Sequence, residues 1–131
     1  MADQQALITH TDFVLLPITD FDRAEAFYAG VLGLPVSKRY RGGVGGEVET
    51  GNLTLMLLDV AKVGREFAPS KGAIALRVDD VEGAQTELER RGVRFQGDII
   101  DSAVCHQAIF EDPDGNMLIL HHRYAPPDAD G

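Results

Sequence analysis

The apolar and polar positions of this chain follow one pattern twice. The two copies are residues 13–31 (FVLLPITDFDRAEAFYAGV) and 73–91 (AIALRVDDVEGAQTELERR), which align without a gap at an offset of sixty. Each copy has a short apolar run, an aspartate, and then apolar residues at helical spacing. A repeat of this length indicates one supersecondary unit used twice, and the surface between the copies is the natural place for a functional site.

In the first copy, the pattern predicts a strand, a helix and three further strands. Residues 11–18 are rich in β-forming residues, and Asp20 follows as a favourable helix N-cap. Gly33 ends the helix and Pro35 prevents it from continuing. Residues 36–58 hold the three strands, divided by RGGVGG at 41–46 and by a turn at 51–52.

The second copy repeats this plan after a linker at residues 59–72. A strand over 73–78 leads to Asp80 as an N-cap, Gly92 ends the helix, and further strands finish in FEDPDGNMLILHH. The sequence therefore predicts a single α+β domain over residues 1–131, built from two tandem βαβββ units at about 11–60 and 72–124. Residues 125–131 (APPDADG) are predicted to be a disordered tail.

Composition narrows the possible partners and the compartment. The net charge of −9 argues against nucleic acid, whose binding sites need clustered lysine and arginine. Cys105 is the only cysteine, which fits a reducing cytoplasm. No signal-peptide pattern opens the chain, and no apolar stretch approaches the roughly 20 residues of a membrane span. We therefore expect a cytoplasmic protein with neither nucleic acid nor membrane as a partner.

Several short motifs, in this order and partly duplicated, resemble those of the vicinal oxygen chelate superfamily. This superfamily groups glyoxalase I, extradiol dioxygenases, fosfomycin-resistance enzymes and bleomycin-resistance proteins, and the resemblance covers residues 12–124. It implies two βαβββ units whose mixed sheet curls around a cavity, and a homodimer. The motifs are Asp20 with Ala26-Phe27-Tyr28, Leu32-Gly33-Leu34, Val78-Asp79-Asp80-Val81, Arg91-Gly92-Val93 and Asp112-Pro113-Asp114-Gly115-Asn116.

The resemblance also implies where enzymes of this family would hold a divalent metal. Their ligands come from the opening and last strands of each unit, and these positions fall on Phe13, Ala73, Ile119 and either Leu55 or Met56. All of these side chains lack the oxygen, nitrogen or thiolate donors that a divalent ion needs. The resemblance is therefore to the metal-free, bleomycin-resistance-like branch, and we predict no metal, no cofactor and no catalytic residue.

Nine residues are predicted to bind a small-molecule ligand. Phe13, Ala73 and Ile119 would form the floor of the cleft because they replace metal ligands. By strand parity, His121 points the same way as Ile119. The full set is Phe13, Tyr40, Glu47, Met56, Phe67, Ala73, His106, Ile119 and His121. Aromatic and aliphatic lining with a few polar fixed points is typical of such pockets.

The sequence leaves three functional readings open. The favoured one is reversible sequestration of an aromatic or antibiotic-like natural product, in drug resistance or self-protection. The second is a metal-dependent lyase or dioxygenase that uses a displaced ligand set, His106, His121 and Glu47. The third is a metal-free enzyme or sensor with His121 or Glu47 as acid or base. Cys105 and His106 are strand neighbours facing opposite ways, so they do not predict a nucleophile–base pair.

Overall fold

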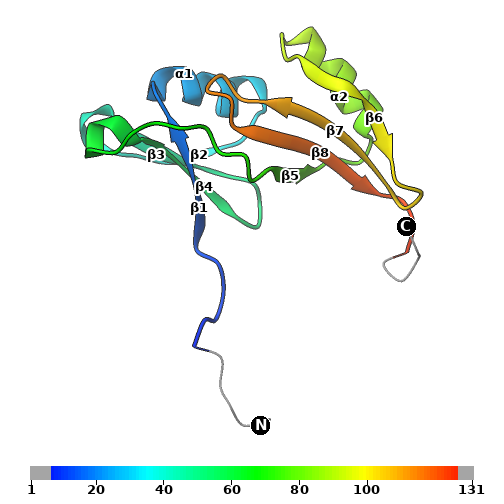
Figure 1. Cartoon of the computed structure of the whole chain (residues 1–131), viewed down its shortest axis with the longest axis horizontal. Coiled ribbons are helices and arrows are strands. Elements are labelled where there is room, and N and C mark those ends of the chain that lie inside the picture. Colours follow the sequence, from blue (N-terminus) through cyan, green and yellow to red (C-terminus); the bar gives the residue numbers. More distant parts are fainter. Residues whose placement is uncertain (1–6, 127–131) are drawn as a thin grey trace.

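The computed structural model describes residues 7–126, and the two copies of the sequence pattern fold as two units (Figure 1). In the first unit, a strand and a helix precede three strands. Its elements are β1 (Phe13–Ile18), α1 (Phe21–Glu25), η1 (Ala26–Val31), β2 (Val36–Arg39), η2 (Arg41–Gly43), β3 (Gly45–Glu49), β4 (Thr54–Asp59) and η3 (Val60–Val63). The predicted first helix is thus an α-helical turn followed by the wider helix η1.

The second unit has the same order without the short helices. Its elements are β5 (Ile74–Arg77), α2 (Val81–Arg90), β6 (Phe95–Asp101), β7 (Cys105–Glu111) and β8 (Met117–Arg123). The predicted tail at 125–131 lies largely outside the described residues. No helix within residues 7–126 is long and apolar enough to cross a membrane.

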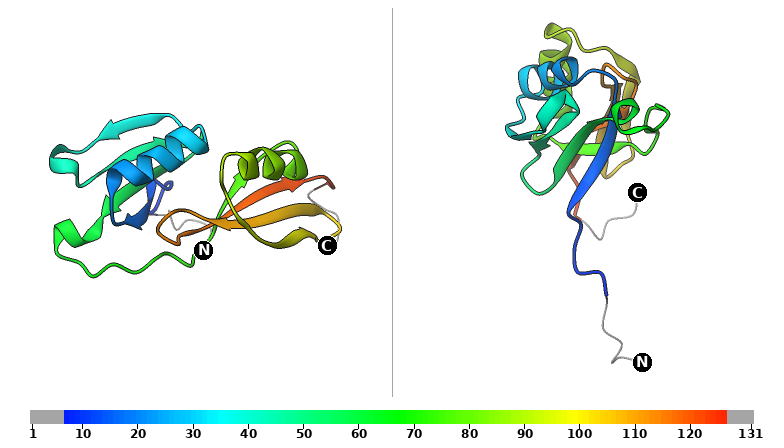
Figure 2. Two further views of the ribbon diagram at one scale, coloured as in Figure 1. Left: turned by 90° about the horizontal axis from the view of Figure 1, so that it is seen from above. Right: turned by 90° about the vertical axis from the view of Figure 1, so that its left-hand side faces the viewer.

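Each unit forms a four-stranded mixed sheet, which confirms the predicted α+β fold of two βαβββ units. The first sheet has the order β1-β4-β3-β2, and the second has β5-β8-β7-β6. The first strand of each unit, β1 or β5, forms one edge of its sheet and pairs in parallel with the last strand of that unit. The other strand pairs are antiparallel. Figure 2 shows the units side by side, with the linker running along one edge to β5.

Strand alternation divides each sheet into a buried face and an open face. Leu16, Leu57 and Leu120 point to the helix side, where they join one hydrophobic core that both units share. Their neighbours along the strands point the other way, and Phe13 and Leu15 remain 47% and 38% exposed. We call the two uncovered surfaces the open faces. They are the natural place for a ligand or a partner to bind.

A buried hydrogen-bond network fixes one junction between the units. Tyr28 of η1 donates through its hydroxyl to Asp112 Oδ2 at 2.7 Å, and both residues are buried. Burial raises the pKa of Tyr28 above its usual range, and the Asp112 carboxylate raises this pKa further, so the hydroxyl stays a donor. Asn116 donates to Asp112 Oδ2 at 2.8 Å and to the Pro17 carbonyl of β1 at 2.7 Å. The Asp-Pro-Asp-Gly-Asn turn of the second unit is therefore tied to the first.

Two local predictions, the aspartate N-caps of the helices and the glycine run at 41–46, agree only in part with the structure. Asp20 caps α1, accepting from the Arg23 amide at 3.3 Å, whereas Asp80 has the N-cap backbone conformation but forms no capping side-chain bond. In the glycine run, Gly46 packs so closely that an added Cβ would lie 2.6 Å from the Phe21 ring. The last two glycines of RGGVGG thus belong to β3, whereas the sequence pattern places the whole run between two strands.

Candidate functional site

The open face of the first sheet carries an apolar row that ends in a polar pair. Leu15, Met56 and Glu47 are direct neighbours across β1, β4 and β3, so their side chains share this face. The Tyr40 hydroxyl donates to Glu47 Oε2. Burial, followed by this hydrogen bond, raises the pKa of Tyr40 to about 12. The hydrogen-bonded Tyr40 and Glu47 side chains thus place a polar group beside the aliphatic side chains of this face.

The open face of the second sheet has two rows. Ala75, Ile119 and Ile109 form an apolar row across β5, β8 and β7. The next row consists of Arg77, His121 and Gln107. Ile119 and His121 therefore share a face, as strand parity predicts. This arrangement again sets a few polar groups against an aliphatic surface, which suits an organic ligand with polar substituents.

The strand register shows which neighbours the sequence reasoning missed. Phe13 pairs with Thr54, and Ala73 lies just before β5, so Leu15 and Ala75 are the direct neighbours of Met56 and Ile119. Met56, rather than Leu55, is on the open face, because Leu55 is fully buried. Phe67 is half-buried in the segment between η3 and β5. Leu15 and Ala75 would have been found by combining the alternation of side chains along each strand with the pairing of β1 with β4 and of β5 with β8.

His106 lies on the opposite face of the second sheet from His121. It pairs with His122 across β7 and β8, and its Nε2 lies 3.3 Å from Asp101 Oδ2. The sequence-predicted group of His106, His121 and Glu47 is therefore not brought together within one chain. Over residues 7–126, no three His, Cys, Asp or Glu side chains gather closely enough to hold a metal ion.

Cys105 and His106 point to opposite faces of β7, as predicted. Cys105 is only 6% exposed, and its Sγ lies 3.1 Å from Ser102 Oγ. This contact with Ser102 lowers the pKa of the Cys105 thiol, and Gln107 acts in the same direction. The cysteine fills space at the end of the sheet.

The residues at the family's metal positions do not fit a divalent ion. Met56 and Ile119 occupy the last strands, and their direct partners on the opening strands, Leu15 and Ala75, are also apolar. A metal site needs several oxygen, nitrogen or thiolate donors at bonding distance, and these four side chains offer at most one thioether. We therefore derive no chemical step through a metal at this place.

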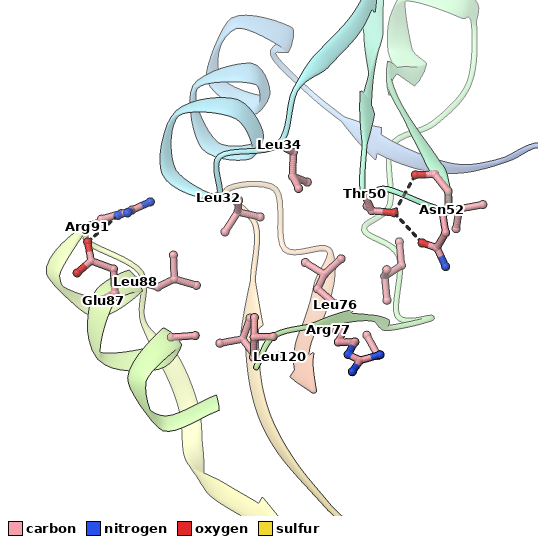
Figure 3. Close-up of a pocket in the computed structure, with 15 residues that line it drawn as sticks. Leu32, Leu34, Thr50, Asn52, Leu76, Arg77, Glu87, Leu88, Arg91 and Leu120 are labelled. Atoms are coloured by element: carbon pink, nitrogen blue, oxygen red, sulfur yellow. Dashed lines mark hydrogen bonds and ion pairs between the residues drawn. The ribbon is translucent and has the colours of Figure 1, made fainter. Parts of the chain in front are cut away.

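A groove of 480 Å³ lies between β5, α2 and the first unit, and it reaches the edge of the second open face, where Ala75 and Arg77 line it. In Figure 3, Glu87 and Arg91 lie at one end of it, and Thr50, Asn52 and Arg77 lie at the other. None of the nine sequence-predicted site residues lines it. The aliphatic side chains that line it include Leu32, Leu34, Ile74, Leu76, Leu88 and Leu120. Ile74, Leu76 and Leu120 lie on the helix side of the second sheet, and the groove meets the second open face at the β5 edge, through Ala75 and Arg77.

Comparison with known proteins identifies the family. The model of the Glyoxalase/Bleomycin resistance protein/Dioxygenase superfamily matches residues 8–120. No curated protein matches the chain. Among solved structures, TnmS3, an antibiotic binding protein from Streptomyces sp. CB03234, is 27% identical, with 91% of this chain and 99% of that one covered and a TM-score of 0.74.

Two further structures have the same fold. A glyoxalase/bleomycin resistance protein from Streptomyces sp. CB03234 is 26% identical, with 86% and 100% coverage and a TM-score of 0.67. Lactoylglutathione lyase from Agrobacterium tumefaciens is 22% identical, with 88% and 95% coverage and a TM-score of 0.74. The family model covers most of the chain, and the duplicated βαβββ fold agrees with it. The chain therefore belongs to the glyoxalase/bleomycin resistance protein/dioxygenase superfamily.

Proposed function

We propose that this protein binds and sequesters an aromatic or antibiotic-like small molecule, without a metal and without turnover, on its open faces. The observation that carries the proposal is the apolar replacement of the family's metal ligands. Met56 and Ile119 stand there, with Leu15 and Ala75 beside them. Such a surface stabilises an organic ring system through burial but offers no Lewis acid. Glu47 and His121 then serve as polar points that orient the ligand.

The proposed binding unit is a homodimer. Within one chain the open faces leave Phe13 and Leu15 substantially exposed, so neither face encloses a ligand by itself. A two-fold dimer that sets the first sheet of one copy opposite the second sheet of the other would create two equivalent clefts. Each cleft would then bring Glu47 from one copy towards His121 from the other. Burial of the apolar rows would stabilise the dimer and the bound ligand together.

The similarity to TnmS3 supports a binding function, because that protein is an antibiotic binding protein and is 27% identical to this chain over almost its whole length. The lyase from Agrobacterium tumefaciens, at 22% identity, supports the fold alone. We infer drug resistance or self-protection as the biological use from this likeness together with the apolar site.

Native mass spectrometry of freshly purified protein, without added metal or chelator, tests the proposal. We expect a dimer of two 14.2 kDa chains, either bare or carrying an organic adduct whose mass identifies the ligand class. One tightly bound divalent ion per chain would overturn the proposal in favour of a metal-dependent lyase or dioxygenase. A bound ligand that is converted during incubation would instead indicate a metal-free enzyme.

A further inference from the structure

The groove between β5 and α2 has a smaller counterpart in the same chain, a hollow of 350 Å³ lined by Phe27, Gly92 and Arg94. The sequence repeat relates residue pairs at an offset of sixty, so Tyr28 corresponds to Leu88 and Phe27 to Glu87. In the first unit, Phe27 and Tyr28 pack edge to face with ring centroids 5.2 Å apart, and Tyr28 is fully buried. In the second unit, Leu88 and Glu87 stand in place of the two rings. The groove is thus the larger of two repeat-related hollows, and an aromatic side chain lines the smaller one.

The units meet at two repeat-related junctions, one beside Tyr28 and one beside Leu88. The turn at the first junction bonds to the neighbouring strand, and over residues 7–126 the turn at the second does not. Asn116 lies against β1 and donates to the Pro17 carbonyl at 2.7 Å, which closes the first junction. The corresponding turn of the first unit places Asn52 beside Arg77 of β5, the repeat partner of Pro17. Asn52 Oδ1 accepts only from Thr50 at 3.3 Å, and the Asn52 amide makes no bond to β5 within the described residues. This end of the groove therefore remains open and keeps unused hydrogen-bond donors.

We propose that this groove is a second ligand site, which takes an apolar molecule with one anionic end. This proposal does not depend on the function proposed for the open faces. The volume of 480 Å³ falls within the roughly 300–1,000 Å³ of typical small-molecule sites. Leucine and isoleucine side chains form the walls and would bury the apolar body. Leu76 and Leu120 place this apolar wall on the helix side of the sheet, whereas Ala75 and Arg77 connect the groove to the edge of the second open face.

The charges at the rim favour an anionic end over a cationic one. The chain as a whole carries a net charge of −9, yet the charged residues that line this groove are Arg77, Glu87 and Arg91. Glu87 accepts from Arg91 Nε at 3.0 Å and from Arg90 Nη2 at 2.7 Å, so neighbouring arginines already compensate its charge. Arg77 forms no ion pair with any residue in the 7–126 range. The anionic end is therefore assigned to Arg77 and the neighbouring Asn52 amide, where charge-assisted hydrogen bonds are available.

The probe for this site is 1-anilinonaphthalene-8-sulfonate, and its neutral analogue N-phenyl-1-naphthylamine is the matched control ligand. We expect the sulfonate to bind one molecule per chain and to shift the NMR methyl signals of Leu76, Leu88 and Leu120. Arg77→Gln should weaken binding of the sulfonate about tenfold, the loss of one charge-assisted contact. The same variant should leave the affinity of the neutral analogue unchanged.

Ala84→Leu fills the groove from α2 with little change in helix propensity, and the exposed Ala61→Leu is its matched control. Ala84→Leu should abolish binding of both probes while its unfolding transition stays cooperative, and Ala61→Leu should change neither. Methyl shifts confined to Ile109 and Ile119 would place the probe on the open face and overturn the proposal. Unchanged affinity in Ala84→Leu, or a wild-type groove that takes no probe because a second copy covers it, would overturn it as well. Because the methyl signals report each place separately, failure here leaves the function proposed for the open faces untouched.

Discussion

Replacing Tyr28 by phenylalanine removes one oxygen atom from the network that joins the two units. The Tyr28 hydroxyl donates to Asp112 Oδ2 at 2.7 Å. The Asp112 carboxylate is 5% exposed and also accepts from the Asn116 side chain and from the backbone amides of Asp114 and Asn116. The substitution therefore leaves a buried carboxylate with three of its four donors. The packing of the aromatic ring against Phe27 is retained.

The size of the effect follows from the charge and the burial. A hydrogen bond to a charged group contributes roughly 1.5–3 kcal/mol, and water cannot readily replace the lost donor at this depth. We take about 2 kcal/mol as the expected loss in the free energy of unfolding. For a chain of 131 residues, the entropy of unfolding is about 0.28 kcal/mol/K near 60 °C, so this loss lowers Tm by about 7 °C.

Thermal and urea unfolding, followed by circular dichroism, measure this loss. Tyr124→Phe is the matched control, because it removes the same atom from a bond to Asp101 of 2.6 Å at a residue that is 47% exposed. The control should change the free energy of unfolding by less than about 0.5 kcal/mol, as surface substitutions usually do. Equal effects of the two substitutions would refute the reasoning, because burial would then not decide the contribution of the bond.

Three further predictions test the open face, the packing and the electrostatics. Ala73→Trp should block ligand binding on the open face while the dimer stays folded, as judged by calorimetric titration and native mass; unchanged affinity, as in the control Ala61→Trp, would refute the place of the cleft. Gly46→Ala should cost roughly 1–3 kcal/mol of unfolding free energy, since its Cβ would lie 2.5 Å from a β2 carbonyl oxygen, whereas Gly30→Ala has open space and should cost nothing. Stability should fall as pH rises from about 10, the pKa of an unfolded tyrosine, towards the Tyr40 pKa of about 12, because the unfolded chain then releases a proton that the folded chain keeps. Urea unfolding across this range checks the slope. Tyrosinate absorbance that rises already near pH 10 in the native Tyr124→Phe protein, which retains only Tyr28 and Tyr40, would contradict it.

The fold was predictable because its signals are local and occur twice. Strand parity placed Ile119 and His121 on one face and separated Cys105 from His106, since both follow from the two-residue period of a strand. Parity alone could not relate His106 to His121, because that needs the pairing of β7 with β8. The groove was beyond sequence reasoning for a related reason: a leucine at 88 looks like ordinary core until its neighbours across the junction are known.

Duplication gives this chain two equivalent junctions, and the two have diverged in a way that separates their roles. Where Tyr28 reaches Asp112, a buried charged hydrogen bond fixes the orientation of one unit against the other. This rigidity matters for the open faces. In the proposed dimer, the shape of each cleft depends on the angle between the two units within each copy. At the second junction, Leu88 leaves a volume that neither unit fills. A ligand that fills it would contact both units and add to the hydrogen bond of 2.7 Å by which Arg91 Nη1 already joins them at the Val31 carbonyl. Binding in the groove would then stiffen the same angle between the units, so occupancy of one place should raise affinity at the other.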